Sequence, residues 1–303
     1  MSIVSVIPAS DQASRLREMM KDKEIAPNRI RGMRSIAVLS GKGGVGKSNI
    51  AVNVGLAIAE RDLRVAILDA DLGLANIDIL FGVVPKYNLS HILRGEKELS
   101  DIVFKVGENV SIIPGGSGLR ELADLDGQSL DWVINKLSFL ENETDVLIMD
   151  TSAGLHRNVL AFAAASDISL LITTPEPTAI KDAYSVIKSL WQIQGGDVNV
   201  KLVVNMASDR NEAALVADKI ISTSEQFLGF KIPYLGYVAW DGAISASVKK
   251  RKPLLLENKN ANPARYFREL ADKILELDDE GAEINEKDSF LRRLVKQMMK
   301  ASV

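Results

Sequence analysis

The strongest constraint on this 303-residue sequence is a glycine-rich segment, Gly41–Ser48, that reads GKGGVGKS. It follows a largely apolar run over residues 35–40, typical of a buried strand, and it precedes a helical pattern over residues 49–60. The pattern G-x-x-x-x-G-K-[ST] between a strand and a helix is typical of a loop that binds nucleotide phosphates. A flexible glycine-rich turn is the alternative. We therefore expect a nucleotide site at the end of the first strand.

The residue types of this loop fit phosphate chemistry. Glycines allow successive backbone N–H groups and the N-terminus of the next helix to converge on a phosphate. Lys47 would contact the β- and γ-phosphates, and the Ser48 hydroxyl would bind Mg²⁺. The expected nucleotide-binding set is Gly41, Lys42, Gly43, Gly44, Val45, Gly46, Lys47, Ser48 and Asn49.

Short aliphatic runs alternate with helical patterns along most of the chain. Further runs of this kind cover residues 65–69, 146–150, 168–173 and 201–205. The alternation predicts an α/β fold, with a mostly parallel twisted sheet flanked by helices on both faces. This body covers residues 34–277. The parts outside it are an N-terminal arm (1–33), an acidic linker (278–287) and a last helix (288–303).

Composition removes several classes of function. The sequence has no cysteine, which excludes disulfides, thiolate zinc sites and iron–sulfur clusters ligated by this chain. A net charge of -3 does not favour direct nucleic-acid binding. The sequence contains no apolar run long enough to span a bilayer. We therefore expect a cytoplasmic protein.

Three aspartates lie at or just after the ends of predicted strands. Asp69 and Asp71 end the run that begins at residue 65, and Asp150 ends the run that begins at residue 146. The run that ends at Asp150 is typical of a Walker B strand, whose terminal carboxylate holds Mg²⁺ directly or through water. Taken alone, Asp69 and Asp71 fit helix-cap and turn positions equally well.

The glycine-rich segment resembles the deviant Walker A sequence, K-G-G-x-G-K-[ST], of the MinD/ParA ATPase family. In that family the early lysine reaches the nucleotide of a second subunit. The resemblance therefore implies that Lys42 acts in trans within an ATP-dependent homodimer. A solvated loop lysine is the alternative for Lys42.

Residues 69–76 resemble the family segment D-x-D-x-G-x-x-N. By this resemblance Asp71 orients the attacking water, Asp69 supports the Mg²⁺ shell and Asn76 faces the partner subunit. The segment after Asp150, Thr151–Gly154, resembles the family's D-x-x-A-G and would lie close to the γ-phosphate.

The expected nucleotide is ATP. Guanine-specific relatives carry N-K-x-D after the strand that here ends near Asn205, and the required aspartate is absent at that spacing. By resemblance to the family, Asn205 contacts adenine.

The arm contains DQASRLR at residues 11–17, which resembles the D-Q-A-x-x-L-R element of the flagellar number regulators of the FlhG type. In that family the element stimulates the SRP-type GTPase FlhF, and Gln12 would be the active contact. The resemblance further implies contacts with the flagellar basal body, including its C-ring. The expected partner-binding residues are Asp11, Gln12, Ala13, Leu16 and Arg17.

The last helix is basic and amphipathic. At about 100° per residue its apolar side chains fall on one half of the circumference, opposite several lysines and arginines. This pattern predicts an interfacial helix that binds anionic membrane at its inner face, with docking on the body or on a dimer partner as the alternative. The expected membrane residues are Phe290, Leu291, Leu294, Val295, Met298 and Met299.

These features favour an ATPase switch that controls flagellar number or placement and cycles between cytosol and membrane. A MinD-type division regulator is the first alternative, although it lacks a long arm with the DQASRLR element. A ParA-type partition ATPase fits the acidic chain and the tail less well. A biosynthetic P-loop enzyme would need a substrate pocket that the sequence does not indicate.

Overall fold

The strands in the described part of the chain form one sheet. The computed structural model describes residues 32–71, 76–116, 118, 136–137, 140–196, 198–277 and 289–300. The strand order is β3-β4-β2-β5-β1-β6-β7-β8. Every pairing is parallel except that of β3 with β4. The strands are β1 (Arg34–Leu39), β2 (Val65–Ala70), β3 (Phe104–Lys105), β4 (Val110–Pro114), β5 (Val146–Thr151), β6 (Ile168–Thr173), β7 (Val200–Ala207) and β8 (Tyr234–Ala239).

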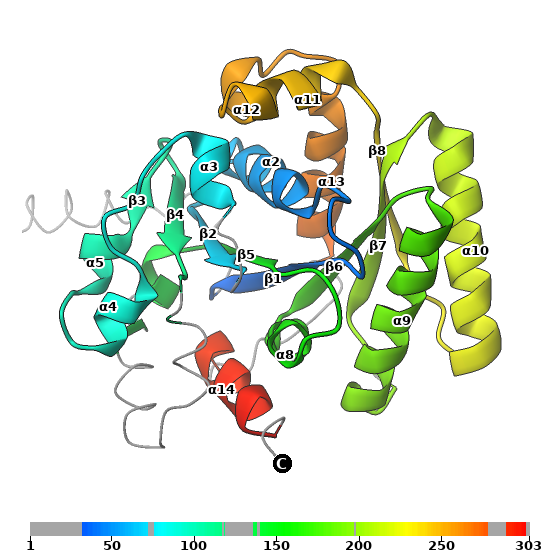
Figure 1. Cartoon of the computed structure of the whole chain (residues 1–303), viewed down its shortest axis with the longest axis horizontal. Coiled ribbons are helices and arrows are strands. Elements are labelled where there is room, and N and C mark those ends of the chain that lie inside the picture. The colour runs from blue at the N-terminus through cyan, green and yellow to red at the C-terminus, as the bar shows by residue number, and fades with distance from the viewer. Residues whose placement is uncertain are drawn as a thin grey trace, which may run out of the picture.

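Helices cover both faces of the sheet (Figure 1). On one side lie α2 and α13, and on the other lie α8 and the last helix, α14. The described helices are α2 (Lys47–Ala59), α3 (Ile77–Phe81), α4 (Leu89–Leu93), α5 (Leu99–Ile102), α8 (Arg157–Ala165), α9 (Pro177–Gln194), α10 (Arg210–Leu228), α11 (Gly242–Lys249), α12 (Leu254–Glu257), α13 (Ala264–Glu276) and α14 (Phe290–Lys300).

The central strands separate two hydrophobic cores. In β1, Ile36 and Val38 belong to the core under α2 and α13, whereas Ala37 and Leu39 belong to the core under α8, α9 and α14. Successive side chains of a strand point to opposite faces, so an entirely apolar strand can serve both cores. Because both faces of the sheet are covered, functional side chains can lie only at the ends of the strands, and the carboxyl ends carry the polar residues.

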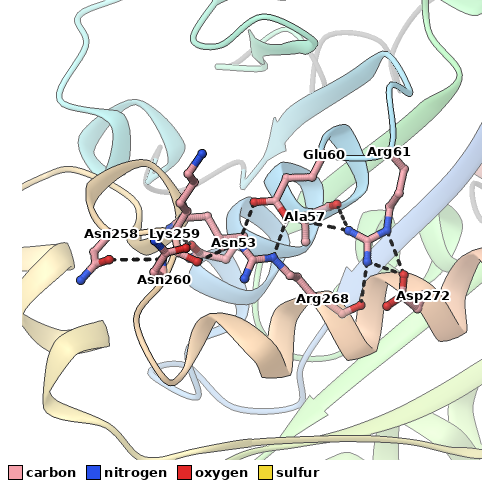
Figure 2. Close-up of polar contacts among 10 residues, drawn as sticks. Asn53, Ala57, Glu60, Arg61, Asn258, Lys259, Asn260, Arg268 and Asp272 are labelled. Atoms are coloured by element: carbon pink, nitrogen blue, oxygen red, sulfur yellow. Dashed lines mark hydrogen bonds and ion pairs between the residues drawn. The ribbon is translucent and has the colours of Figure 1, made fainter.

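The helix that follows the glycine-rich loop is fixed along its length by α12 and α13 (Figure 2). Arg268 donates to both carboxylate oxygens of Glu60, at 2.6 and 2.8 Å, and Arg61 donates to Asp272. Deeper in the helix, the fully buried Asn53 accepts a hydrogen bond from the backbone of Leu255 at 3.2 Å. The loop at the start of α2 is thus mounted on a rigid element.

The predicted α/β fold is confirmed. The boundaries expected for the five strands and for α2 differ from the observed ones by at most two residues; for example, α2 begins at Lys47 where the pattern predicted residue 49. Residues 1–31 of the arm, which include residues 11–17, the acidic linker and residues 72–75 lie outside the described residues. Within the described residues, no helix is long and apolar enough to cross a membrane.

Candidate functional site

The glycine-rich loop joins β1 to α2, and two of its glycines have no room for a side chain. A Cβ on Gly41 would lie 2.5 Å from the backbone of Asp182 in α9. A Cβ on Gly46 would overlap the Nδ2 atom of Asn205, and Gly46 also has a positive φ of 84°. The loop is therefore packed closely between α9 and the end of β7, as a loop that wraps a phosphate with its backbone must be.

Lys47 and Asp150 form a buried ion pair at the centre of the site. The Nζ atom of Lys47 lies 2.5 Å from Oδ1 of Asp150, and the side chains are 8% and 0% exposed. Burial raises the pKa of the Asp150 carboxyl, whereas the Lys47 ammonium and the nearby Ser48 hydroxyl lower it. When phosphate occupies the loop, Lys47 can exchange this carboxylate for phosphate oxygens.

Asp150 and Ser48 fit the Mg²⁺ role expected of them. The second carboxylate oxygen of Asp150, Oδ2, is buried and has no hydrogen-bond partner among the described residues. An ionised oxygen without a partner is costly to bury unless another group, such as a cation, compensates it. Carboxylate and hydroxyl oxygens are ligands that Mg²⁺ accepts beside phosphate. Ser48 and Asp150 would thus hold the metal.

Lys42 lies apart from this pair. Its ammonium contacts the Glu176 carboxylate and donates to the Thr178 hydroxyl at 3.0 Å, both at the start of α9. The Lys42 side chain is 38% exposed. The first lysine of the loop is thus held at the surface of the chain, outside the buried pair of Lys47 and Asp150.

Asp69 organises the segment after β2. Its carboxylate accepts backbone hydrogen bonds from Asp71 at 3.2 Å, Asn76 at 2.9 Å and Ile77 at 3.1 Å. Burial raises the pKa of Asp69 to about 6, and the charge of Asp150 adds to this shift. The buried Asp69 carboxylate therefore binds the backbone at the start of α3. This is the helix-cap and turn role that the sequence left open as an alternative for Asp69. Asp71 is partly exposed, and its charge is close enough to Asp150 to raise the pKa of the Asp150 carboxyl.

The segment after Asp150 is tied to the glycine-rich loop. The backbone N–H of Gly154 donates to the carbonyl of Ser40 at 2.8 Å, directly before Gly41. Gly154 has a positive φ of 97°, which favours glycine here. His156 is exposed and stands at the N-cap position of α8, where its side chain makes no capping hydrogen bond.

Asn205, the residue predicted to contact adenine, lies beside the glycine-rich loop. Its Nδ2 donates to the carbonyl of Val45 at 2.7 Å. The next residue, Met206, sits in a bulge between β7 and β8 with a positive φ of 58°, and its terminal carbon would lie 3.3 Å from a Cβ on Gly46. No sequence signal marks Met206, because a bulge depends on the register of two strands.

The predicted membrane helix is docked on the body. Four of its six expected membrane residues are buried, namely Phe290, Leu291, Leu294 and Met298, and Val295 packs partly buried against the same core. Met299 is 58% exposed. The arrangement in the structure is thus the alternative in which the apolar face contacts the body. The expected partner-binding residues of the arm, Asp11 to Arg17, lie outside the described residues.

A family model described as ParA, NUBPL iron-transfer P-loop NTPase, matches residues 32–275. The sequence is 35% identical to the antiactivator FleN of Pseudomonas aeruginosa, over 79% of this chain and 85% of that protein. It is 31% identical to the flagellum site-determining protein YlxH of Helicobacter pylori, over 95% of this chain and 99% of that protein.

The solved structure of the septum site-determining protein MinD from Pyrococcus horikoshii, complexed with Mg-ADP, is similar in fold. The TM-score is 0.65 at 24% sequence identity, and the match covers 83% of this chain and 100% of that one. Although the matching family model is named for iron transfer, this sequence has no cysteine to ligate an iron–sulfur cluster.

Proposed function

The chain belongs to the ParA/MinD family of P-loop NTPases, and from this membership we propose that it is an ATP-driven switch that regulates the number and placement of flagella. The reaction is slow, Mg²⁺-dependent hydrolysis of ATP to ADP and phosphate. The observation that carries the proposal is the separation of the two loop lysines, with Lys47 buried on Asp150 and Lys42 held outside at Glu176.

The buried residues provide the part of the chemistry that one subunit supplies. Lys47 and the backbone N–H groups of the loop neutralise the phosphates, while Ser48 and Asp150 hold Mg²⁺, which stabilises the charge that develops on the phosphate oxygens. Asp71, partly exposed beside Asp150, orients the attacking water. Asp69 supports this arrangement by fixing the backbone of Asp71.

Lys42 completes the site of a second subunit. To act in trans, Lys42 must leave Glu176 and Thr178. The phosphates of ATP in a partner subunit carry more negative charge than the Glu176 carboxylate, so they can replace it as the partner of the Lys42 ammonium. Dimerisation is then a condition of hydrolysis, with Asn76 at the interface. This dependence makes the enzyme a switch, because the dimer lasts only while ATP is intact.

The flagellar assignment rests on the relatives. FleN is named an antiactivator and YlxH a flagellum site-determining protein, and the match with YlxH covers 95% of this chain. We propose the SRP-type GTPase FlhF as the partner of the arm, through Gln12, and components of the flagellar C-ring as further partners.

Membrane binding belongs to the same cycle. The tail helix presents apolar residues that can contact either the body or lipid, so docking and membrane binding compete for one face. Two tails on an ATP-held dimer gain effective concentration at an anionic surface. The protein would then be cytoplasmic as a monomer and peripheral to the inner face of the cytoplasmic membrane as a dimer.

A MinD-type division regulator is the second candidate, since the core has the fold of MinD. The arm separates the two. A peptide of residues 1 to about 25 should stimulate the GTPase rate of the cognate FlhF-type protein, because a glutamine amide can orient a water without titrating. The same peptide with Gln12→Ala should lose most of this effect. No stimulation by the unmodified peptide would favour the division regulator.

A further inference from the structure

The turns on either side of α12 carry positive charge that the phosphate site does not use. The first turn follows α11 and holds four consecutive cations, Lys249 to Lys252, and the second turn holds Asn258, Lys259 and Asn260. We refer to the two turns together as the basic surface. Residues 242–263 contain five cations and a single carboxylate, a net charge of +4 in a chain whose net charge is -3. The charge of the whole chain therefore conceals a local region of opposite sign.

Backbone contacts fix the position of both turns. Arg251 has a positive φ of 54°, and its carbonyl oxygen would lie 3.1 Å from a Cβ on Gly82, at the end of α3. A residue other than glycine is uncommon in this conformation and persists where the surrounding structure holds it. In the second turn, Arg268 of α13 donates to the carbonyl of Lys259 at 2.8 Å (Figure 2). The cations are therefore presented from a fixed backbone.

One carboxylate joins the two turns and neutralises only part of their charge. Glu257, the last residue of α12, lies 2.7 Å from the ammonium of Lys250 and 3.1 Å from that of Lys252. Because the second turn starts directly after Glu257, these ion pairs place the first turn beside it. Lys249 and Arg251 are exposed, and neither forms an ion pair with another described residue. The basic surface thus carries more cations than its own carboxylate can neutralise.

The residue types favour the phosphates of a nucleic acid as the ligand. Lysine is depleted at protein–protein interfaces, whereas lysine, arginine and asparagine are side chains that contact nucleic-acid phosphates. A membrane fits less well, because Leu254 and Leu255, between the two turns, are buried in the core under α2 and α13. The tail helix that is proposed to bind the membrane packs against the opposite core, so it does not extend this surface (Figure 1).

We propose that the basic surface binds the phosphate backbone of double-stranded DNA without sequence preference. Cations on two adjacent turns can contact successive phosphates, and each contact releases condensed counterions. Most of these cations lie on turns and not along a helix that could enter the major groove, so the binding should depend on salt and not on sequence. The inference goes beyond the proposed switch, because one subunit carries the whole surface.

The test is the fluorescence anisotropy of a labelled DNA duplex of about 20 base pairs, titrated with the full chain in ADP. Three to four phosphate contacts predict a slope of about -2.7 to -3.6 in the logarithm of the affinity against the logarithm of the salt concentration. Between about 50 mM and about 200 mM salt the affinity should therefore fall by about 40- to 150-fold. Two duplexes of unrelated sequence should bind within about twofold of each other.

A triple variant assigns the site by replacing three lysines of the first turn: Lys249→Gln, Lys250→Gln and Lys252→Gln. At low salt it should bind the duplex at least about tenfold more weakly, and its salt slope should be smaller by about two to three. Glu257→Gln should act in the opposite direction and strengthen binding by about two- to fivefold, because it removes the carboxylate that competes with phosphate for the cations. A purely structural role of these lysines predicts no such gain.

The matched control makes the same change of charge at three exposed lysines outside the basic surface: Lys188→Gln, Lys219→Gln and Lys231→Gln. It should bind the duplex within about threefold of the unmodified protein. Both triple variants should unfold at the same urea concentration as the unmodified protein, since all six side chains are exposed.

Three results would overturn the inference. The first is an absence of duplex binding by the unmodified chain at low salt, and the second is an equal loss of affinity in the two triple variants. The third is a first-turn variant that keeps its affinity for the duplex but no longer sediments with vesicles of phosphatidylcholine and phosphatidylglycerol, which would assign the surface to a membrane. Because the titration is done in ADP, its outcome does not depend on ATP-driven dimerisation.

Discussion

Replacing Asp69 with asparagine should change the pH dependence of stability between about pH 4 and 6. Asp69 is 4% exposed, and its carboxylate accepts three backbone N–H groups from the segment that begins α3. These N–H groups carry partial charges, which do not offset the cost of burying a carboxylate. Burial therefore dominates and raises the pKa from 3.8 to about 6.

The sign follows from proton linkage. The native state binds a proton at Asp69 more tightly than the unfolded state, so the free energy of unfolding falls as the pH rises from the unfolded pKa to the folded one. A rise in pKa from 3.8 to about 6 corresponds to about 3 kcal/mol, and relaxation around the buried charge reduces the expected loss to about 2 kcal/mol. The asparagine side chain carries no charge. Its amide nitrogen replaces one acceptor at every pH, so the pH-dependent part of the difference carries the test.

The assay is urea unfolding of the nucleotide-free protein at several pH values between about 4 and 7.5. The free energy of unfolding of Asp69→Asn minus that of the unmodified protein should increase by about 2 kcal/mol from about pH 4 to about pH 6.5. Asp78→Asn, a partly exposed aspartate in α3, should give no such rise. A difference for Asp69→Asn that stays constant within about 0.5 kcal/mol across the range would refute the reasoning.

Three further predictions concern the loop, the water and the tail. In urea unfolding, Gly41→Ala should destabilise the nucleotide-free protein by about 1–3 kcal/mol, because the added Cβ meets the backbone of Asp182. Gly43→Ala is the control, and it should cost less than about 1 kcal/mol because the space around Gly43 is open. Equal losses of stability in the two variants would contradict this prediction. Asp71→Ala should accumulate as an ATP-bound dimer in size-exclusion chromatography with turnover reduced at least about tenfold, and normal turnover would exclude its role in orienting water. Deletion of residues 289–303 should abolish sedimentation with anionic liposomes, and the binding of the intact chain should weaken with salt; undiminished binding of the truncated chain would reject the membrane role.

Much of the fold could be predicted from local pattern. The alternation of aliphatic runs with helical segments, and the segment between residues 41 and 48, were enough to predict the central sheet and the position of the glycine-rich loop at its carboxyl edge. Asp150 could be placed beside that loop because the carboxyl ends of neighbouring parallel strands meet at one edge.

Contacts between distant segments could not be predicted in the same way. Lys42 and Glu176 are 134 residues apart, and nothing in either segment says that the start of α9 lies against the loop. The bulge at Met206 depends on the register of β7 with β8. The tail is a case where the pattern was correct but incomplete, since an amphipathic helix requires an apolar partner and does not specify whether it is lipid or protein.

The most direct test of the switch is the oligomeric state and ATPase rate of Lys42→Ala. We expect this variant to bind ATP nearly as well as the unmodified protein, because Lys47 and the loop backbone remain, yet to stay monomeric in size-exclusion chromatography with ATP and to lose hydrolysis. Glu176→Ala is the matched control: it removes the contact that holds Lys42 in its own subunit and should leave ATP-dependent dimerisation possible. A Lys42→Ala protein that dimerises with ATP and hydrolyses it at the normal rate would contradict the proposed switch.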